Sequence, residues 1–197
     1  MDSARYWLAL VAVVGFPPVL LYWFLIHPFV RFWRRLGVRT TYACVVAVLV
    51  VCAAGLFLIR KPLLSVDLGT HYAVAALGAV CLASAAWMRL RINRQVTGSF
   101  LAGLPELDPG RVPGKVVAEG IYSKMRHPRY VELTIAFAGW ALLANYLAPY
   151  VFVALWIPAM YFITVLEEKE LLERFGEPYE EYRRRVPRFL PRRRLDG

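Results

Sequence analysis

Cationic, imidazole, phenolic and carboxylate side chains flank the two open ends of an apolar hairpin in this sequence. Two apolar runs, 131–144 and 150–166, are separated by a short turn at 145–149. If the runs fold as antiparallel helices, the residues before the first run and after the second lie together at one end. The residues that this arrangement gathers are Arg126, His127, Tyr130, Glu167 and Glu168.

These side chains indicate a site for a ligand of mixed charge. Pro128 fits the first turn of a helix, so the free backbone N–H groups after it, together with Arg126, favour an anion. Glu167 and Glu168 can accept hydrogen bonds from an ammonium group or from ribose hydroxyls. Aromatic faces that attract a cation are supplied by Tyr122, Tyr130, Tyr179 and Tyr182. S-adenosylmethionine has the carboxylate, ammonium, hydroxyl and cationic groups that these side chains would bind. Basic and aromatic residues are, however, common at any membrane surface.

Composition indicates an integral membrane protein. The 197 residues are 59% hydrophobic, with a mean hydropathy of +0.47, whereas soluble domains average about 45–50%. We predict an all-α polytopic fold with about five transmembrane helices, at 6–30, 42–59, 71–90, 131–144 and 150–166. Each run is near the ~20 residues that a bilayer requires, but the fourth reaches that length only if it starts at His127.

The predicted spans belong to one domain with two regions. Residues 1–90 hold three transmembrane helices, and residues 91–197 form the catalytic region. That region comprises a connecting segment, the transmembrane hairpin and amphipathic C-terminal helices. In the third span, Gly78 and alanines at four-residue spacing allow close packing against another helix in lipid.

The distribution of positive charge predicts the orientation. Of the 24 Lys and Arg residues, 21 follow the first span, separate the third from the fourth, or lie in the C-terminal tail. Five spans place these three segments on one side, and the positive-inside rule puts that side in the cytoplasm and the N-terminus outside. Membrane topology thus accounts for the basic excess, and we expect no nucleic-acid partner.

The order of the motifs is similar to a known group of enzymes. Gly120-Ile121-Tyr122 is followed by Arg126-His127-Pro128-Arg129-Tyr130, the apolar hairpin and an acidic segment that starts at Glu167. Over about residues 119–191 this resembles the isoprenylcysteine carboxyl methyltransferase family and the related phospholipid methyltransferases. The resemblance implies a membrane-embedded, S-adenosylmethionine-dependent methyltransferase with its cofactor site at the cytoplasmic face. The lipophilic acceptor from the bilayer would be an isoprenylcysteine-like carboxylate or an aminophospholipid.

The resemblance also implies which residues hold the cofactor. We expect either Glu167 or Glu168, not both, to carry most of that binding, because neighbours on a helix point about 100° apart. The full expected set is Gly120, Tyr122, Arg126, His127, Pro128, Tyr130, Glu167, Glu168 and Tyr182. Methyl transfer is an in-line displacement that depends mainly on alignment, and it requires no metal because the cofactor supplies the electrophile.

Glu132 departs from the family pattern, which often has glycine at this position. An ionisable group near the bilayer is by default a functional hypothesis, so Glu132 and Arg129 are the candidate catalytic residues. Glu132 is either a base for an amine acceptor or the ion-pair partner of Arg129, three residues earlier on the same helix face. A carboxylate acceptor would require no base.

Two other functional classes compete with an enzyme. A non-catalytic membrane module that binds anionic lipid or a partner protein explains the basic face but not the ordered motifs. A small transporter is disfavoured because the first three spans lack buried charges.

Overall fold

The computed structural model describes residues 2–96, 107–108 and 115–190 of the chain. Within these ranges the protein is all helical, which confirms the predicted fold class. The helices are α1 (Asp2–Ile26), α2 (Val30–Leu36), α3 (Val38–Leu58), α4 (Arg60–Leu63), α5 (Tyr72–Asn93), the 3-10 helix η1 (Gly120–Ser123), α8 (Pro128–Ala144), α9 (Leu147–Phe175) and α10 (Glu177–Arg185).

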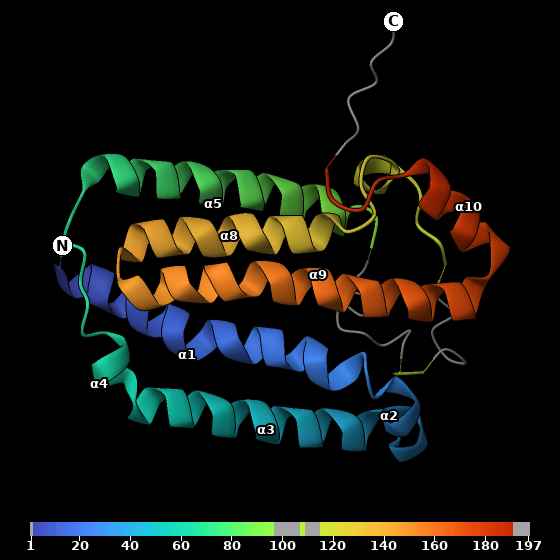
Figure 1. The fold of residues 1–197 in the computed structure, drawn as a ribbon, viewed down its shortest axis with the longest axis horizontal. Helices are drawn as coiled ribbons and strands as arrows, with labels where there is room; N and C mark the ends of the chain where they lie inside the picture. The colour runs from blue at the N-terminus through green and yellow to red at the C-terminus, as the bar shows by residue number, and fades with distance from the viewer. Residues whose placement is uncertain (1, 97–106, 109–114, 191–197) are drawn as a thin grey trace, which may run out of the picture.

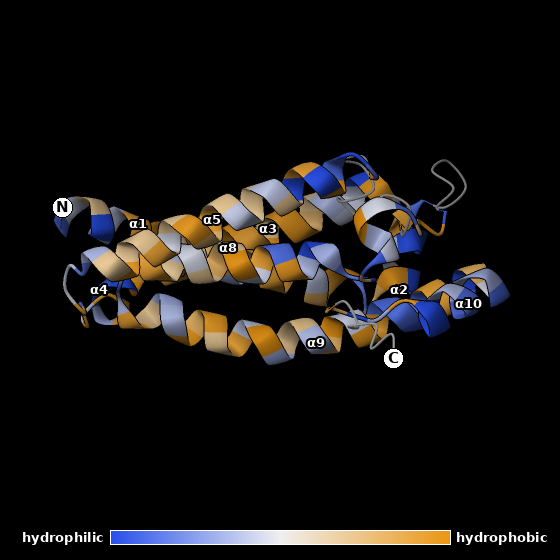
Figure 2. Cartoon of the chain, turned by 90° about the horizontal axis from the view of Figure 1, so that it is seen from above, coloured by the Kyte–Doolittle hydropathy of each residue, from blue (hydrophilic) through white to orange (hydrophobic). Residues whose placement is uncertain are grey.

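The long helices lie side by side in an antiparallel bundle (Figure 1). Helix α8 is central, since it packs against α5, α1 and α9, while α3 packs on the far side of α1. Hydrophobic residues dominate the length of the helices, and hydrophilic residues gather at the end that carries α2 and α10 (Figure 2). The basic segments that the sequence groups on one side therefore lie, as far as they are described, at one end of the bundle.

The lengths of the spans differ from the prediction in one respect. Four helices, α1, α3, α5 and α9, are long and apolar enough to cross a membrane, where the sequence predicts about five spans. The fourth predicted span, α8, has 17 residues, because Pro128 begins the helix and Asn145 ends it. At 1.5 Å per residue α8 is about 26 Å long, slightly less than a typical hydrocarbon core. The protein remains an all-α polytopic membrane protein.

Helix α9 extends further than the sequence suggests. It runs unbroken for 29 residues to Phe175, so the predicted fifth span and the first amphipathic segment of the tail form one helix. The helix ends before Gly176, because this glycine adopts φ 61°, a left-handed conformation that favours glycine. Helix α10 starts there and folds back beside the end of α9.

A buried arginine fastens the opposite end of the bundle. Arg5, only 6% exposed, donates to the carbonyl oxygen of Ala144 at 3.2 Å and pairs with Asp67. Asn145 turns the chain between α8 and α9 with φ 52°, a left-handed conformation that asparagine tolerates. Its side chain donates to the Gly69 carbonyl oxygen at 2.7 Å. These contacts tie the hairpin turn to the start of α1 and to the segment before α5.

Two glycines bring α5 and α8 into close contact. A Cβ placed on Gly78 would lie 2.8 Å from the backbone oxygen of Gly139, and a Cβ on Gly139 would lie 2.9 Å from the Gly78 oxygen. Such distances are too short for a real side chain. The close packing expected from small residues in the third span therefore depends on this glycine pair.

We predict that Gly78→Ala destabilises the bundle by about 1–3 kcal/mol, since the backbone of α8 must move to admit the methyl group. Gly55→Ala is the matched control, because Gly55 lies in α3 with nothing within 4 Å of the added Cβ. Equilibrium unfolding in detergent micelles measures both. Equal stability of the two variants would contradict the tight α5–α8 contact.

Candidate functional site

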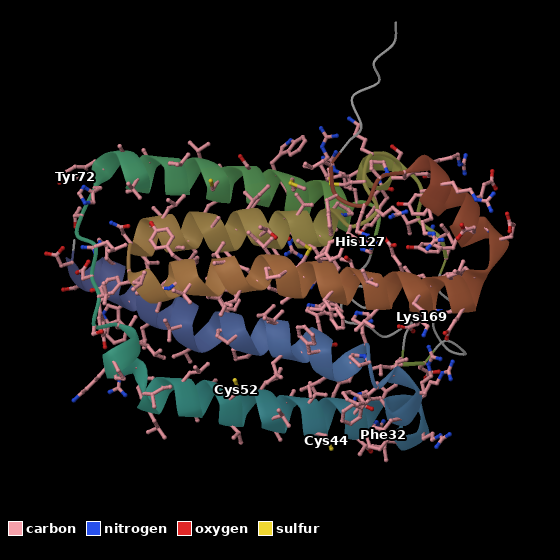
Figure 3. The ribbon with its side chains drawn as sticks, viewed as in Figure 1. Phe32, Cys44, Cys52, Tyr72, His127 and Lys169 are labelled. Carbon is pink, nitrogen blue, oxygen red and sulfur yellow. The ribbon has the colours of Figure 1, made fainter. Side chains whose placement is uncertain are left out.

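A pocket opens at the end of the bundle where the predicted site residues meet. It contains about 820 Å³ of space not filled by protein atoms, part of it open to solvent. Its wall is formed by the last turn of α1, residues 115–117, η1, the start of α8, the end of α9 and helix α10. His127 lies at this end of the molecule and Tyr72 at the other (Figure 3).

Most of the predicted site residues line this pocket. The lining includes Tyr122, Arg126, His127, Pro128, Arg129, Tyr130, Glu167 and Tyr182. Three predicted residues, Gly120, Glu132 and Glu168, are not part of the lining. The structure thus brings the two motif blocks together and separates residues that face the pocket from residues that support it.

Glu168 is the centre of a buried ionic network behind the pocket wall. It is 3% exposed, and its Oε1 lies 2.9 Å from His127 Nε2 and 3.0 Å from a terminal nitrogen of Arg126. Arg188 donates to both carboxylate oxygens, at 3.0 and 2.6 Å, and these hydrogen bonds raise the pKa of its guanidinium. One carboxylate therefore holds two arginines and a histidine, which come from two separate segments.

Backbone hydrogen bonds fix the tail against the start of α8. The amides of Arg126 and His127 donate to the carbonyl oxygens of Pro187 and Arg188, at 2.9 and 3.1 Å. Arg126 also donates to the carbonyl oxygen of Arg183 at 2.7 Å. The segment after α10 is consequently fixed behind Arg126 and His127, two residues of the pocket wall.

Several buried polar atoms of the pocket lining have no hydrogen-bond partner within the described ranges, and three of them differ in chemistry. Glu167 Oε2, Arg126 Nε and the Tyr179 hydroxyl are buried and lack a hydrogen-bond partner there. Glu167 Oε2 has only an ionic contact, at 3.6 Å from His127 Nδ1. Because buried polar groups are normally hydrogen-bonded, a carboxylate, a guanidinium N–H and a phenol left unpaired together indicate a ligand site.

The tyrosines around the pocket are held neutral. Burial raises the pKa of Tyr122, Tyr179 and Tyr182, and the negative charges of Glu167, at Tyr122, and Glu168, at Tyr179 and Tyr182, add to the effect. The Tyr182 hydroxyl donates to the carbonyl oxygen of Tyr122 at 2.7 Å, so it links α10 to η1. These phenols can donate hydrogen bonds and present their rings, but they are poorly suited to act as bases.

Glu132 has a partner that the sequence does not predict. Its carboxylate lies 2.5 Å from Arg89 on α5, so the ion pair that the sequence offered as one of two alternatives forms with Arg89 and not with Arg129. Arg129 instead stacks over the Trp23 ring, with its guanidinium carbon 5.5 Å from the ring centroid. Helix α5 passes so close to α8 that a residue from another helix satisfies Glu132.

Gly120 supports the site through its backbone. It adopts φ 58°, and a Cβ there would lie 2.5 Å from the Gln95 side chain. A residue with a side chain would be strained in this conformation and would crowd Gln95. Gly120 thus lets η1 lie against the end of α5 and aims Tyr122 into the pocket.

The lining also contains residues outside the predicted catalytic and cofactor-binding set. Trp23 and His27 come from the end of α1, far from either motif, and a histidine directly after an apolar run was the available signal. The other residues are Lys115, Val116, Val117, Leu171, Phe175 and Tyr179. Three of these, Leu171, Phe175 and Tyr179, follow the amphipathic spacing of the tail and face the pocket.

The match of the family model described as Phospholipid methyltransferase extends from residue 72 to residue 178, more than half of the chain. This range contains α5, the first motif block, the hairpin and the start of the acidic segment, as far as Pro178. The chain belongs to the phospholipid methyltransferase family. Trp23 and His27, which complete the pocket from α1, lie outside the matched range.

Three curated relatives each match about two fifths of the chain. A protein-S-isoprenylcysteine O-methyltransferase of Schizosaccharomyces pombe is 40% identical over 78 residues, 39% of this chain and 33% of that protein. The nickel-cobalt-cadmium resistance protein NccN of Alcaligenes xylosoxydans xylosoxydans is 33% identical over 83 residues, 42% of this chain and 39% of that protein.

A third relative is methanethiol S-methyltransferase 1 of Bradyrhizobium diazoefficiens, 33% identical over 81 residues, 38% of this chain and 25% of that protein. The chain therefore spans between a quarter and about two fifths of the length of these relatives. No solved structure matches it.

We predict that Glu168→Ala destabilises the protein by about 3–5 kcal/mol, because it leaves the guanidinium groups of Arg126 and Arg188 without their carboxylate. Glu181→Ala is the control, since Glu181 is exposed and pairs only loosely with Arg185 at 3.9 Å; such pairs contribute about 0–1 kcal/mol. Unfolding in mixed micelles compares the two. A loss for Glu168→Ala no larger than for the control would show that the network does not stabilise the fold.

Proposed function

We propose that this protein is an S-adenosylmethionine-dependent methyltransferase that acts on a lipophilic acceptor at the cytoplasmic end of the bundle. The observation that carries the proposal is the group of unpaired buried atoms in the pocket, Glu167 Oε2, Arg126 Nε and the Tyr179 hydroxyl. Membership of the phospholipid methyltransferase family supports the reaction class.

The polar groups of the pocket fit the proposed cofactor. S-adenosylmethionine has an ammonium group, a carboxylate, ribose hydroxyls and a cationic sulfonium. Glu167 would accept a hydrogen bond from the ammonium group or a ribose hydroxyl, and Arg126 would bind the carboxylate, as a guanidinium does well. The tyrosine rings of η1 and α10 would face the sulfonium, which aromatic faces attract. When bound, the cofactor supplies an electrophilic methyl group.

The protein would contribute alignment and exclusion of water. His127 is fixed between Glu168 and Glu167, so its ring forms a rigid part of the wall. Arg129 lines the pocket and is the proposed catalytic residue that contacts the acceptor. Glu132, which is paired with Arg89 outside the lining, is proposed to act as a positioning residue that fixes α5 against the start of α8.

Relatives of this protein are named for different kinds of methyl acceptor. One relative is named for an isoprenylcysteine acceptor and another for methanethiol, so membership of the family does not specify the nucleophile. We propose a lipophilic acceptor because the inner wall is formed by Trp23 and Tyr130, where α1 and α8 leave the apolar part of the bundle. Anchoring in the bilayer would deliver such an acceptor to this wall.

The proposed orientation places this end of the bundle in the cytoplasm. The described basic residues of the α1–α3 link, the segment before α8 and the tail lie here, while Arg5, Arg60 and Lys61 lie at the other end. Because positive residues are retained on the cytoplasmic side, the N-terminus would face outward. Cysteine labelling from either side of sealed vesicles, at an introduced Glu177→Cys, tests the orientation.

We predict that Glu167→Gln lowers the affinity for S-adenosylhomocysteine about 10- to 100-fold, since a charged hydrogen bond contributes about 1.5–3 kcal/mol. Glu173→Gln is the matched control on the same helix, because Glu173 pairs with Arg31 at 3.0 Å and faces away from the pocket. Isothermal calorimetry in detergent measures both variants. Unchanged affinity in Glu167→Gln would place the donor elsewhere.

We also predict that saturating S-adenosylhomocysteine raises the unfolding temperature of the wild-type protein and not of His127→Ala, because a ligand that binds the folded state stabilises it by mass action. A wild-type protein without any shift would favour a membrane module that binds anionic lipid through its basic end.

A further inference from the structure

Methyl transfer to a thiol or an amine releases a proton, so the pocket of such an enzyme must contain a base. The acidic groups near the motif blocks are poorly placed for this role. Glu167 is assigned above to the methyl donor, Glu168 is held by two arginines and a histidine, and Glu132 is paired with Arg89 outside the lining. The two nitrogens of His127 face Glu168 and Glu167, at 2.9 and 3.6 Å.

A second histidine lines the pocket from the opposite wall. His27 directly follows α1 and is 7% exposed. Its ring stacks on Trp23, with the centroids 5.3 Å apart and the planes 14° from parallel. Trp23 in turn contacts Tyr130 with ring centroids 6.0 Å apart. This stack fixes His27 in the wall on the α1 side of the pocket.

His27 also borders a second cavity, which lies between the α1–α2 turn and α9. Glu170 lines this second cavity but not the first pocket, and its Oε2 lies 3.5 Å from His27 Nδ1. Its other oxygen accepts a hydrogen bond from Arg34 on α2 at 3.0 Å. The imidazole thus stands between two cavities, with a carboxylate on the side of the second one.

We propose that His27 is the general base of the reaction and that Glu170 orients it, so that the methyl acceptor is a lipophilic thiol or amine rather than a carboxylate. This inference rests on the methyltransferase function proposed above. A proton held on Nδ1 toward Glu170 makes Nε2 the basic nitrogen of the ring. A carboxylate behind a base histidine also stabilises the imidazolium that forms.

Methyl transfer and deprotonation of the acceptor together conserve atoms and charge. The acceptor sulfur or nitrogen forms the bond to the methyl carbon, while the methyl–sulfonium bond breaks and leaves its electron pair on sulfur. The acceptor proton passes to His27 Nε2, and Glu170 faces the resulting cation. The second cavity, which is open to solvent, offers a route by which the proton leaves.

Several charged groups surround His27 and set its protonation. Around the second cavity they are Arg31, Lys169, Glu170 and Glu173, with Arg34 on the far oxygen of Glu170. In the pocket they are Lys115, Arg126, His127, Arg129 and Glu167, with the lining tyrosines Tyr122, Tyr130, Tyr179 and Tyr182. Glu170 Oε2 lies 3.5 Å from Nδ1 of the ring, so removal of this carboxylate gives the clearest signal.

Titration of His27 can be followed directly, because the protein has three histidines. In the full chain labelled with ¹³C-histidine, the resonance lost in His27→Gln identifies His27. We expect Glu170→Gln to move its titration to lower pH by about one unit, since an anion near the ring favours the imidazolium. Arg34→Gln, which removes a cation from the same cluster, should move it to higher pH. No shift in either variant would overturn the dyad.

Methyl transfer to three probes tests the assigned chemistry: dodecanethiol, dodecylamine and N-acetyl-S-farnesylcysteine. We expect the wild-type protein to methylate the thiol or the amine, and His27→Gln to lower that kcat/KM at least about 100-fold while its calorimetric affinity for S-adenosylhomocysteine stays at the wild-type level. In Glu170→Gln the acid limb of the rate profile should move to lower pH. His71→Gln, at the other end of the bundle, should retain wild-type transfer and binding.

Different outcomes separate this inference from the proposed function. Methylation of the farnesylcysteine carboxylate alone, transfer to none of the probes, or full activity of His27→Gln would overturn the role of His27 while donor binding persists. A wild-type protein that binds no S-adenosylhomocysteine would overturn the methyltransferase proposal itself.

Discussion

One buried carboxylate, that of Glu168, determines how the site is assembled. Its oxygens hold Arg126 and His127 from the start of α8 and Arg188 from the tail. A carboxylate so far from water is stable only when its cationic partners remain in place, so the three segments must come together or the network fails. The tail segment is thereby held behind the pocket wall by ionic contacts as well as by the packing of Phe189.

The acidic pair shows how adjacent residues take separate tasks. Glu167 and Glu168 follow each other on α9 and point about 100° apart. Glu168 faces the ionic network, where its hydrogen-bonding capacity is fully used, and Glu167 faces the pocket with one oxygen unpaired among the described residues. His127 lies between them and contacts both. Glu168 thus orients the wall of the pocket, and Glu167 faces a ligand from that wall.

Local patterns in the sequence were enough to predict the hairpin and the gathering of its polar ends, because each depends on neighbouring residues. The contacts that the sequence did not predict are long-range. Arg89 reaches Glu132 only because Gly78 and Gly139 bring two helices unusually close, and no spacing along the chain reveals that contact. His27 could not be placed either, since it joins the pocket through the packing of α1 on α8 and α9.

The far end of the bundle matters for the pocket through the register of the hairpin. The link between α8 and α9 consists of Asn145 and Tyr146. A slip of one residue in α9 would rotate the helix by about 100° and turn one of the two acidic residues into the direction that the other now takes. Arg5 holds the last carbonyl oxygen of α8, and a bridge between Asp67 and Tyr146 fixes the first residue before α9. Because a helix transmits its rotation along its whole length, these contacts near the N-terminus of the chain determine which carboxylate reaches the pocket at the other end.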